Sequence, residues 1–265
     1  MLGQGRAPLV VLGVTVMSVI GARLMGASPS LLIAAGVIGA LLGLAIVFVR
    51  RKLREGLTRN LPADHPEVVA LCSRLPLREP WPRFGGWAIL PDFAELLLEL
   101  TKERPHACIL ELGGGASTQV LAAALGDSTR IVSVEAEKRF ADDLRDALTH
   151  QELTDHVEVL DAAMSGTPPW YDRERVQSAA ERLGPIDLLV VDGPSTALDA
   201  RAREPAMPEL LSRLAPDATV VLDDTVREGE QAIVEAWREQ GLLEGFEVEQ
   251  RPLGRGAIVL RRQST

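Results

Sequence analysis

From residue 91 onward, apolar and polar positions follow two alternating patterns. Short continuous apolar runs, such as residues 107–112 and 186–193, are typical of parallel strands covered on both faces. Between such runs lie longer segments with apolar positions at helical spacing, such as 138–150 and 228–241. The pattern predicts an α/β domain over residues 91–265, in which a mainly parallel seven-stranded sheet is the middle layer of a three-layer sandwich.

Three local patterns refine this prediction. The segments "FEVEQ" (246–250) and "GAIVLRR" (256–262) flank "RPLGR", which predicts a hairpin and one antiparallel strand at the sheet edge. Asp92 and Glu95 have the spacing of a capping box at the start of the first helix. Residues 167–175, "TPPWYDRER", contain two prolines and are expected to form an irregular insertion, either a substrate loop or a surface tether.

Two uncharged apolar runs precede the domain, at residues 7–22 and 29–49. The second has 21 residues, and at about 1.5 Å per residue it spans the roughly 30 Å hydrocarbon layer of a bilayer. A short polar turn joins the runs, and both contain small residues that allow close helix packing. We predict a transmembrane helical hairpin over residues 1–50. The alternative is a cleaved signal peptide over residues 1–27.

Charge is unevenly distributed along the chain. The formal net charge is -9, yet the basic cluster "RRKLR" directly follows the second apolar run. This cluster favours a cell-membrane protein whose domain faces the cytoplasm. The remaining sequence is strongly acidic and lacks a basic stripe, which argues against nucleic acid as a partner. Residues 51–90 form a proline-rich neck, in which Trp87 is expected either in a pocket wall or in a surface contact.

Each predicted parallel strand ends in an acid. Ligands of such sheets bind beyond the carboxyl ends of the strands, so these acids are expected to share one edge. Their charge favours a cationic ligand, a metal, or a ligand rich in hydroxyl and amino donors. The acids are Glu111, Glu135, Asp161, Asp192, and Asp223 with Asp224.

The stretch "ILELGGGAST" at 109–118 has an acid before a run of glycines. It resembles the first motif of class I S-adenosylmethionine (SAM)-dependent methyltransferases, and the resemblance extends over about residues 92–260. It implies that Glu111 binds the methionine end of SAM, and that Glu135 accepts hydrogen bonds from the ribose hydroxyls. It also implies a cofactor site completed by Gly113, Gly115, Ser117, Asp161 and Ala162, with backbone close to the ligand at the glycines.

The second half of the predicted site resembles methyltransferases similar to catechol O-methyltransferase. That resemblance implies a divalent cation such as Mg²⁺, held by Asp192, Asp223 and Asp224, with Asp192 also serving catalysis. The chain departs from the pattern in two ways: Asp224 replaces an asparagine, and Ser195 stands where a general-base lysine is expected. The segments "GWAILPDF" and "VDGPS" are also similar to a poorly characterised group of bacterial methyltransferases.

Several alternatives remain at this point. The glycines could serve a nicotinamide dinucleotide, although no full G-x-G-x-x-G is present. Glu135 and Asp161 could cap helices, and so could Asp223 and Asp224 near Glu228. The favoured function is a membrane-anchored methyltransferase that methylates oxygen on a small or lipid-linked acceptor. Trp87, Trp170 and Tyr171 are candidates to shape the acceptor pocket.

Two other functions are weighed. One is a catalytically silent SAM-fold module that binds partners at the membrane, and the other is an aminopropyl-transferring enzyme. The sequence carries no signal of oligomeric state.

Overall fold

The chain forms two compact units, one up to Arg59 and the other from Asn60 onward. For residues 47–57 only the backbone is described. The computed structural model describes residues 15–18, 20, 23–24, 26, 28–57, 59–103, 107–196 and 199–263.

The second unit is built on a seven-stranded sheet, as predicted. Its order is β3-β2-β1-β6-β7-β9-β8, and every strand pair is parallel except those of β9. The one strand that runs opposite to the others is β9, and it lies inside the sheet, whereas β8 forms the edge. The prediction that the strand of opposite direction is the edge strand is therefore wrong. The hairpin itself is confirmed: β9 folds back beside β8 and inserts next to β7. The strands are β1 (Cys108–Leu112), β2 (Arg130–Glu135), β3 (Val157–Asp161), β6 (Ile186–Val191), β7 (Leu214–Asp223), β8 (Phe246–Arg251) and β9 (Ala257–Arg262).

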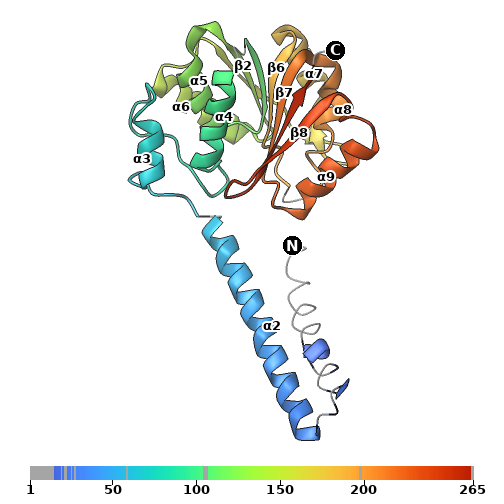
Figure 1. Ribbon diagram of the computed structural model, residues 1–265. Coiled ribbons are helices and arrows are strands. Elements are labelled where there is room, and N and C mark those ends of the chain that lie inside the picture. The colour runs from blue at the N-terminus through green and yellow to red at the C-terminus, as the bar shows by residue number, and fades with distance from the viewer. Residues whose placement is uncertain are drawn as a thin grey trace. The chain divides into compact units, whose positions relative to one another are not determined.

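Helices cover both faces of the sheet (Figure 1). Side chains alternate between the faces, so Leu110 packs in one core and Ile109 in the other. One core contains α4 (Pro91–Glu103), α5 (Ala116–Leu125) and α6 (Lys138–Gln151). The other contains α7 (Arg173–Leu183), α8 (Ala206–Leu210) and α9 (Glu228–Glu239). Two short 3₁₀ turns follow α5 and α8, at Gly126–Ser128 and Leu211–Arg213.

The segment between β3 and β6 is more ordered than predicted. Strands β4 (Met164–Ser165) and β5 (Trp170–Tyr171) pair as a small hairpin, and α7 follows. Trp170 and Tyr171 are buried because their rings cover the core beside α7. The carboxylate of Asp172 caps α7 by accepting a hydrogen bond from the Arg175 amide at 3.1 Å. The sequence prediction missed α7 because half of its buried positions are alanines and they lie among charged residues.

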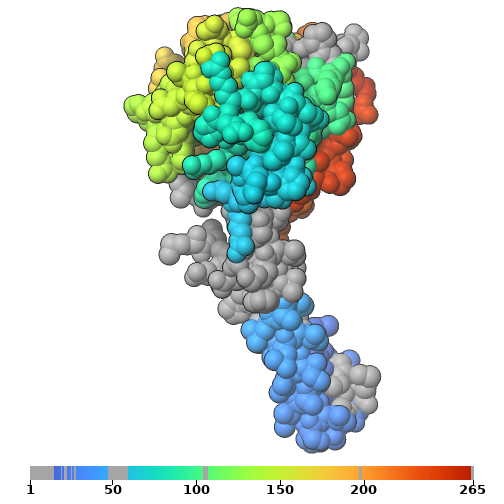
Figure 2. Space-filling view, turned by 90° about the vertical axis from the view of Figure 1, so that its left-hand side faces the viewer, coloured from blue at the N-terminus to red at the C-terminus, as the bar shows by residue number. Residues whose placement is uncertain are grey.

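The residues that follow Asn60 pack against the domain. Helix α3 (Pro66–Cys72) buries three side chains in the core of α4. Arg78, which follows α3, is bonded to the buried side chain of Gln151 in α6. The Gln151 side chain accepts a hydrogen bond from the Arg78 amide at 2.7 Å and donates one to the Arg78 carbonyl at 2.9 Å. The segment from Asn60 through α4, cyan to teal in Figure 2, therefore covers much of one face of the domain.

The predicted capping box at Asp92 is absent. Asp92 lies inside the first turn of α4, and its carboxylate accepts a hydrogen bond from the Gly254 amide at 2.6 Å. Glu95 instead pairs with Arg74. Asp92 therefore ties α4 to the β8–β9 turn, a contact that no local pattern could reveal.

In the first unit, helix α2 (Pro29–Leu57) is the one helix among the described residues that is long and apolar enough to cross a membrane, over Pro29–Ile46. Its Gly39 lies against Thr15 and Ser18, leaving no room for a Cβ. Most of the predicted first span, residues 7–22, lies outside the described residues. The structure thus describes one candidate span rather than two, and the hairpin stays a prediction.

Candidate SAM and metal site

The strand-end acids form a row along one edge of the sheet. Adjacent parallel strands lie about 4.8 Å apart, so five neighbouring strand ends span roughly 19 Å. The two sides of the row correspond to the two groups that the sequence analysis separated: three acids for the cofactor and three for a metal. In sheet order the acids are Asp161, Glu135, Glu111, Asp192 and Asp223.

Glu111 lies in a buried cluster of hydroxyl groups at the end of β1. One carboxylate oxygen accepts hydrogen bonds from Thr118 and, at 2.9 Å, from Ser133. Burial raises the pKa of Glu111, whereas the hydroxyls of Ser117, Thr118 and Ser133 hold the rise back. The other oxygen, Oε1, is buried with no partner among the described residues. A ligand that donates a hydrogen bond or carries positive charge would satisfy it.

The glycines after β1 serve different purposes. Gly113 has φ +89°, and a Cβ there would lie 2.6 Å from the Gly193 amide nitrogen. Glycine is therefore required at 113 by the contact between two loops, and no ligand is needed to explain it. A Cβ at Gly115 would meet nothing within 4 Å, so this residue faces open space. Ser117, also predicted to bind cofactor, is buried beside Glu111.

Glu135 and Asp161 are paired neighbours on β2 and β3. Glu135 Oε1 accepts hydrogen bonds from the amides of Ala136 at 2.9 Å and Glu137 at 3.4 Å. Burial raises the pKa of Glu135, and those two amides partly oppose the rise. Its carboxylate organises its own loop rather than capping α6, whose start has no side-chain cap. The buried Ala162 amide donates to the Glu135 carbonyl at 2.8 Å, which fixes the loop after β3 beside it.

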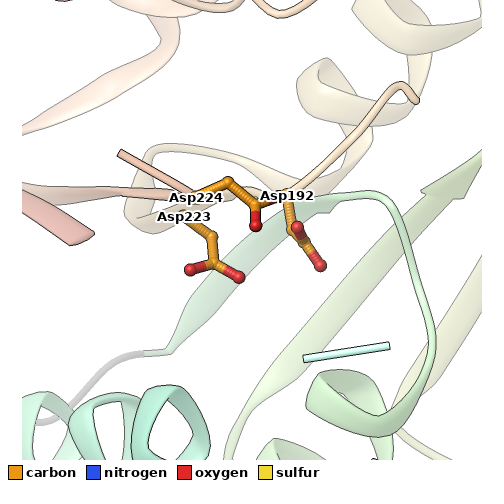
Figure 3. A group of neighbouring side chains, drawn as sticks. All are labelled: Asp192, Asp223 and Asp224. Atoms are coloured by element: carbon orange, nitrogen blue, oxygen red, sulfur yellow. The ribbon is translucent and has the colours of Figure 1, made fainter. Parts of the chain in front are cut away.

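Asp192, Asp223 and Asp224 converge at the other end of the row (Figure 3). One carboxylate oxygen from each lies within 4.8 Å of the others. Successive strand residues normally point to opposite faces, so Asp223 and Asp224 would diverge in a regular strand. Asp224 instead has φ +65°, a left-handed conformation that turns its side chain back toward Asp223. This local backbone conformation assembles the cluster.

The cluster has unsatisfied oxygens. Both carboxylate oxygens of Asp223 and Oδ1 of Asp224 are buried without a partner among the residues described. Burial and the neighbouring Asp224 raise the pKa of Asp223 to about 7, although Arg203 and Arg255 oppose the shift. Burial, followed by the charge of Asp223, also raises the pKa of Asp192 well above its usual value. Buried oxygen atoms of this kind fit a divalent cation such as Mg²⁺.

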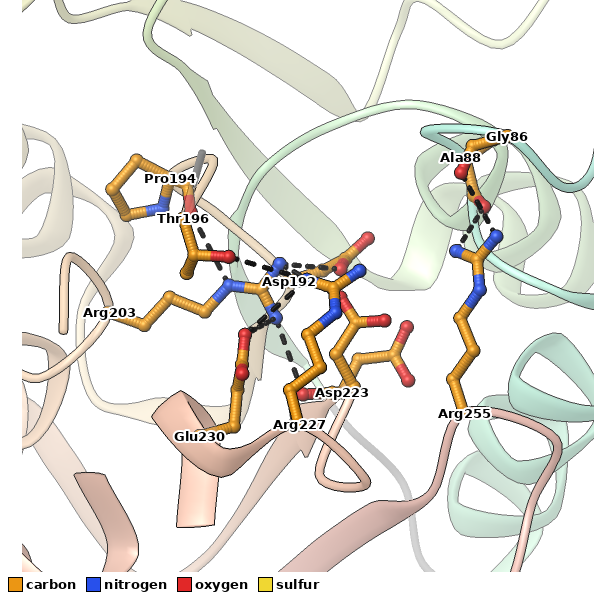
Figure 4. A network of polar contacts seen from close by, with 11 residues as sticks. Gly86, Ala88, Asp192, Pro194, Thr196, Arg203, Asp223, Arg227, Glu230 and Arg255 are labelled. Carbon is orange, nitrogen blue, oxygen red and sulfur yellow. Dashed lines mark hydrogen bonds and ion pairs between the residues drawn. The ribbon is translucent and has the colours of Figure 1, made fainter. Parts of the chain in front are cut away.

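Arg203 is a central residue of the site that sequence reasoning missed (Figure 4). Its buried guanidinium lies 3.3 Å from Asp192 and 3.1 Å from Asp224, and 3.6 Å from Glu230 of α9. Although burial opposes it, the surrounding carboxylates raise the pKa of Arg203. Arg227 adds a second cation, 2.8 Å from Asp224. The one signal of this network in the sequence is the surplus of acids at the strand ends, which an arginine could neutralise. Nothing in the sequence shows that Arg203 is that arginine.

The structure excludes the capping alternative for Asp223 and Asp224. Helix α9 begins at Glu228 after Arg227, and no side chain caps it. Arg203 and Arg227 also leave the oxygens of Asp223 free, so the network alone does not account for the cluster.

Trp87 lies on a turn that Arg255 holds near this cluster. The Arg255 guanidinium donates to the carbonyls of Gly86 at 3.0 Å and Ala88 at 2.9 Å, and its charge lowers the pKa of Asp223 (Figure 4). Trp87 between them is 83% exposed. Trp170, in contrast, is fully buried in the core, so of the two only Trp87 is available to an acceptor.

Solved structures share this fold. A methyltransferase from Geobacter sulfurreducens is 19% identical, with a TM-score of 0.51 over 77% of this chain and 91% of that chain. An O-methyltransferase from Bacillus cereus, solved with S-adenosylhomocysteine (SAH), is 22% identical, with a TM-score of 0.50 over 65% and 82%. The O-methyltransferase TomG from Streptomyces achromogenes, solved with SAM, is 22% identical, with a TM-score of 0.51 over 68% and 83%. No curated protein matches the sequence.

The fold and the row of strand-end acids define a Rossmann-like methyltransferase domain. Residues 110–225 match the family described as "Methyltransferase domain", which spans β1 through the metal-type cluster. The matched segment carries the methyltransferase domain that the resemblance implied, and O-methyltransferases solved with SAM or SAH share its fold. The nicotinamide alternative is set aside.

Proposed function

We propose that the protein is an O-methyltransferase that uses a divalent cation to bind a hydroxylated acceptor. The observation that supports this most directly is the pair of unpartnered buried oxygens of Asp223, beside the free oxygen of Asp224. O-methyltransferases are among the solved structures that share the fold. Such a cation, when bound, would lower the pKa of an acceptor hydroxyl and orient it toward the methyl group.

In this proposal the two halves of the acid row hold the two reactants. Glu135 accepts hydrogen bonds from the ribose hydroxyls of SAM, and Glu111 Oε1 accepts one from its methionine amino group. Gly115 lets the ligand approach the backbone closely, and Ser117 and Asp161 with Ala162 shape the remaining wall. Asp192, next to Glu111 in the row, lies where acceptor and cofactor would meet. Methyl transfer then needs alignment and exclusion of water more than an added catalytic group.

Metal binding is the first test. Titration of Mg²⁺ into SAH-loaded protein should give a calorimetric signal that Asp223→Asn weakens by about tenfold or more, because a carboxylate ligand becomes a neutral amide. Asp143→Asn, an exposed acid on α6, should leave the signal unchanged. If the protein gives no Mg²⁺ signal, or if Asp223→Asn binds as well as the parent, the proposed cation site is wrong.

The same titration should depend on pH. Asp223 has a pKa of about 7, so protons compete with the cation below that pH and affinity should fall by about tenfold per pH unit. Folded Asp223 binds its proton more tightly than the unfolded chain does. The stability that this proton contributes is therefore lost as pH rises from about 4 toward 7.

We propose further that α2 anchors the protein in a membrane with the domain on the cytoplasmic side. The full chain should sediment with membranes and resist a carbonate wash, whereas residues 60–265 should remain soluble, because the apolar span is removed. A full chain that washes off at high pH would contradict the anchor. Sequencing the mature N-terminus distinguishes the predicted hairpin over residues 1–50 from the alternative of a signal peptide cleaved after residue 27, and the neck over residues 51–90 is compatible with either result.

An anchored enzyme encounters acceptors held in the same membrane, so a lipid-linked hydroxyl is the favoured acceptor, with a small soluble hydroxyl compound as the other case. Trp87 would supply an apolar wall beside the acid cluster. A catalytically silent module is favoured only by Ser195 in place of a lysine base, and the unpartnered Glu111 Oε1 argues for a working cofactor site. Aminopropyl transfer is the less favoured alternative because O-methyltransferases are among the solved structures that share the fold; the free oxygen itself does not separate the two reactions, since the decarboxylated cofactor keeps the amine.

A further inference from the structure

The hydroxyl group of Tyr171 is a buried polar group with no hydrogen-bond partner in the described part of the chain. Tyr171 is 1% exposed, and its ring packs edge-on against Trp170 with centroids 5.1 Å apart. The ring therefore belongs to the core, but nothing there uses the hydroxyl. Buried polar groups of native proteins are almost always satisfied, so a partner is expected from outside the described chain.

The hydroxyl lies where the loops after β1 and β6 meet. A Cβ on Gly193 would clash with the Tyr171 hydroxyl oxygen, and it would also lie 2.7 Å from the Gly113 Cα. Tyr171 thus reaches from the core to the glycine contact at the centre of the acid row. The absence of a side chain at 193 is what leaves room for the hydroxyl.

Charged groups of both halves of the site act on this hydroxyl. Burial raises the pKa of Tyr171 well above its usual value, and the charges of Glu135, Asp192 and Glu111 add to the rise while Arg203 opposes it. The three acids come from the ends of β2, β6 and β1. The hydroxyl therefore keeps its proton, and it is close enough to be affected by the charges of the acids assigned to the ribose and to the methionine end of SAM.

We propose that Tyr171 is a cofactor-binding residue whose hydroxyl forms a hydrogen bond with a polar atom of SAM, either on the ribose or at the methionine end. The inference rests on the cofactor site proposed above. It explains why an aromatic residue of the β4–β5 hairpin ends in a polar atom beside Gly193. It also gives that hairpin a function, since β5 carries the ring into the site from the face of α7.

Tyr171→Phe tests the proposal because it removes one oxygen and keeps the ring. The dissociation constants of SAM and SAH, measured by calorimetry on the full chain in detergent, should each rise about tenfold, the loss of one hydrogen bond. The melting temperature of the ligand-free variant should stay the same or rise, because an unsatisfied buried hydroxyl is removed. Lower affinity with undiminished stability is the signature of a group that serves the ligand.

Thr101→Val is the matched control. It removes a hydroxyl that donates to the Leu98 carbonyl at 2.9 Å, near the end of α4 that precedes β1 and thus away from the site. It should lower the melting temperature and leave both dissociation constants unchanged. If Tyr171→Phe lowers the melting temperature with unchanged affinity, the hydroxyl serves the fold and the proposal is overturned. If the parent protein binds neither SAM nor SAH, the cofactor site itself fails, which is a different result.

Discussion

Replacing Arg203 by methionine should destabilise the domain by about 3–5 kcal/mol, the range for removing one partner of a buried ion pair. The guanidinium is buried between Asp192, Asp224 and Glu230, and methionine fills similar space without charge. The three carboxylates would then remain close together in a buried site, with less positive charge to offset their negative charge. Urea denaturation of the detergent-solubilised protein gives the free energy of unfolding, with circular dichroism as the signal.

The loss should also depend on pH. Carboxylates left without Arg203 bind protons more readily in the folded state, so the variant should come closer to the parent near pH 5 than near pH 8. Arg238→Met provides the control: this arginine is half-exposed and pairs with Glu235 one turn away, and its removal should change stability by at most about 1 kcal/mol. A similarly small effect of Arg203→Met would mean that the network does not hold the cluster together.

Glu135→Ala should weaken binding of SAM and of SAH by about a hundredfold or more. Two hydrogen bonds from ribose hydroxyls to a carboxylate contribute about 1.5–3 kcal/mol each, and each 1.4 kcal/mol is a factor of ten. Because both cofactors contain the same ribose, both should lose affinity equally. Calorimetry with each ligand measures the effect directly.

Glu137→Ala is the comparison for Glu135→Ala. Glu137 lies two residues later, is exposed, and pairs with Arg139 at 3.0 Å. Glu137→Ala therefore removes the same charge from the same loop but leaves the proposed ribose position unchanged. Its affinity for SAH should be close to that of the parent. Equal losses from both variants would indicate a general charge effect, and no loss from Glu135→Ala would remove Glu135 from the cofactor site.

The fold was largely predictable because the central strands β1 and β6 are covered on both faces. Such strands appear in the sequence as continuous apolar runs, and 107–112 and 186–193 became β1 and β6 with small changes at their ends. The position of β9 was not predictable in this way. A hairpin at the end of the chain is evident from its turn, but which of its strands pairs with β7 is decided by contacts across the whole sheet.

Helix α7 shows the opposite difficulty. Its buried positions Val176, Ala179, Ala180 and Leu183 are at helical spacing, yet small alanines among charges give a weak apolar signal. The helix is stabilised by the core that it covers and by its cap, Asp172, more than by its own pattern.

The sequence by itself determined that acids would line one edge of the sheet, because parallel strands bring their carboxyl ends together and each run ended in an acid. The glycines after Glu111 also carried the resemblance to methyltransferases, which the match over residues 110–225 supports. Tertiary structure alone decided what surrounds those acids. Arg203 and Tyr171 are distant in sequence from the residues they approach, and Gly113 is required by a neighbouring loop. Spacing along a chain encodes periodic contacts, whereas a buried ion pair or an unsatisfied hydroxyl is defined only by the elements packed around it.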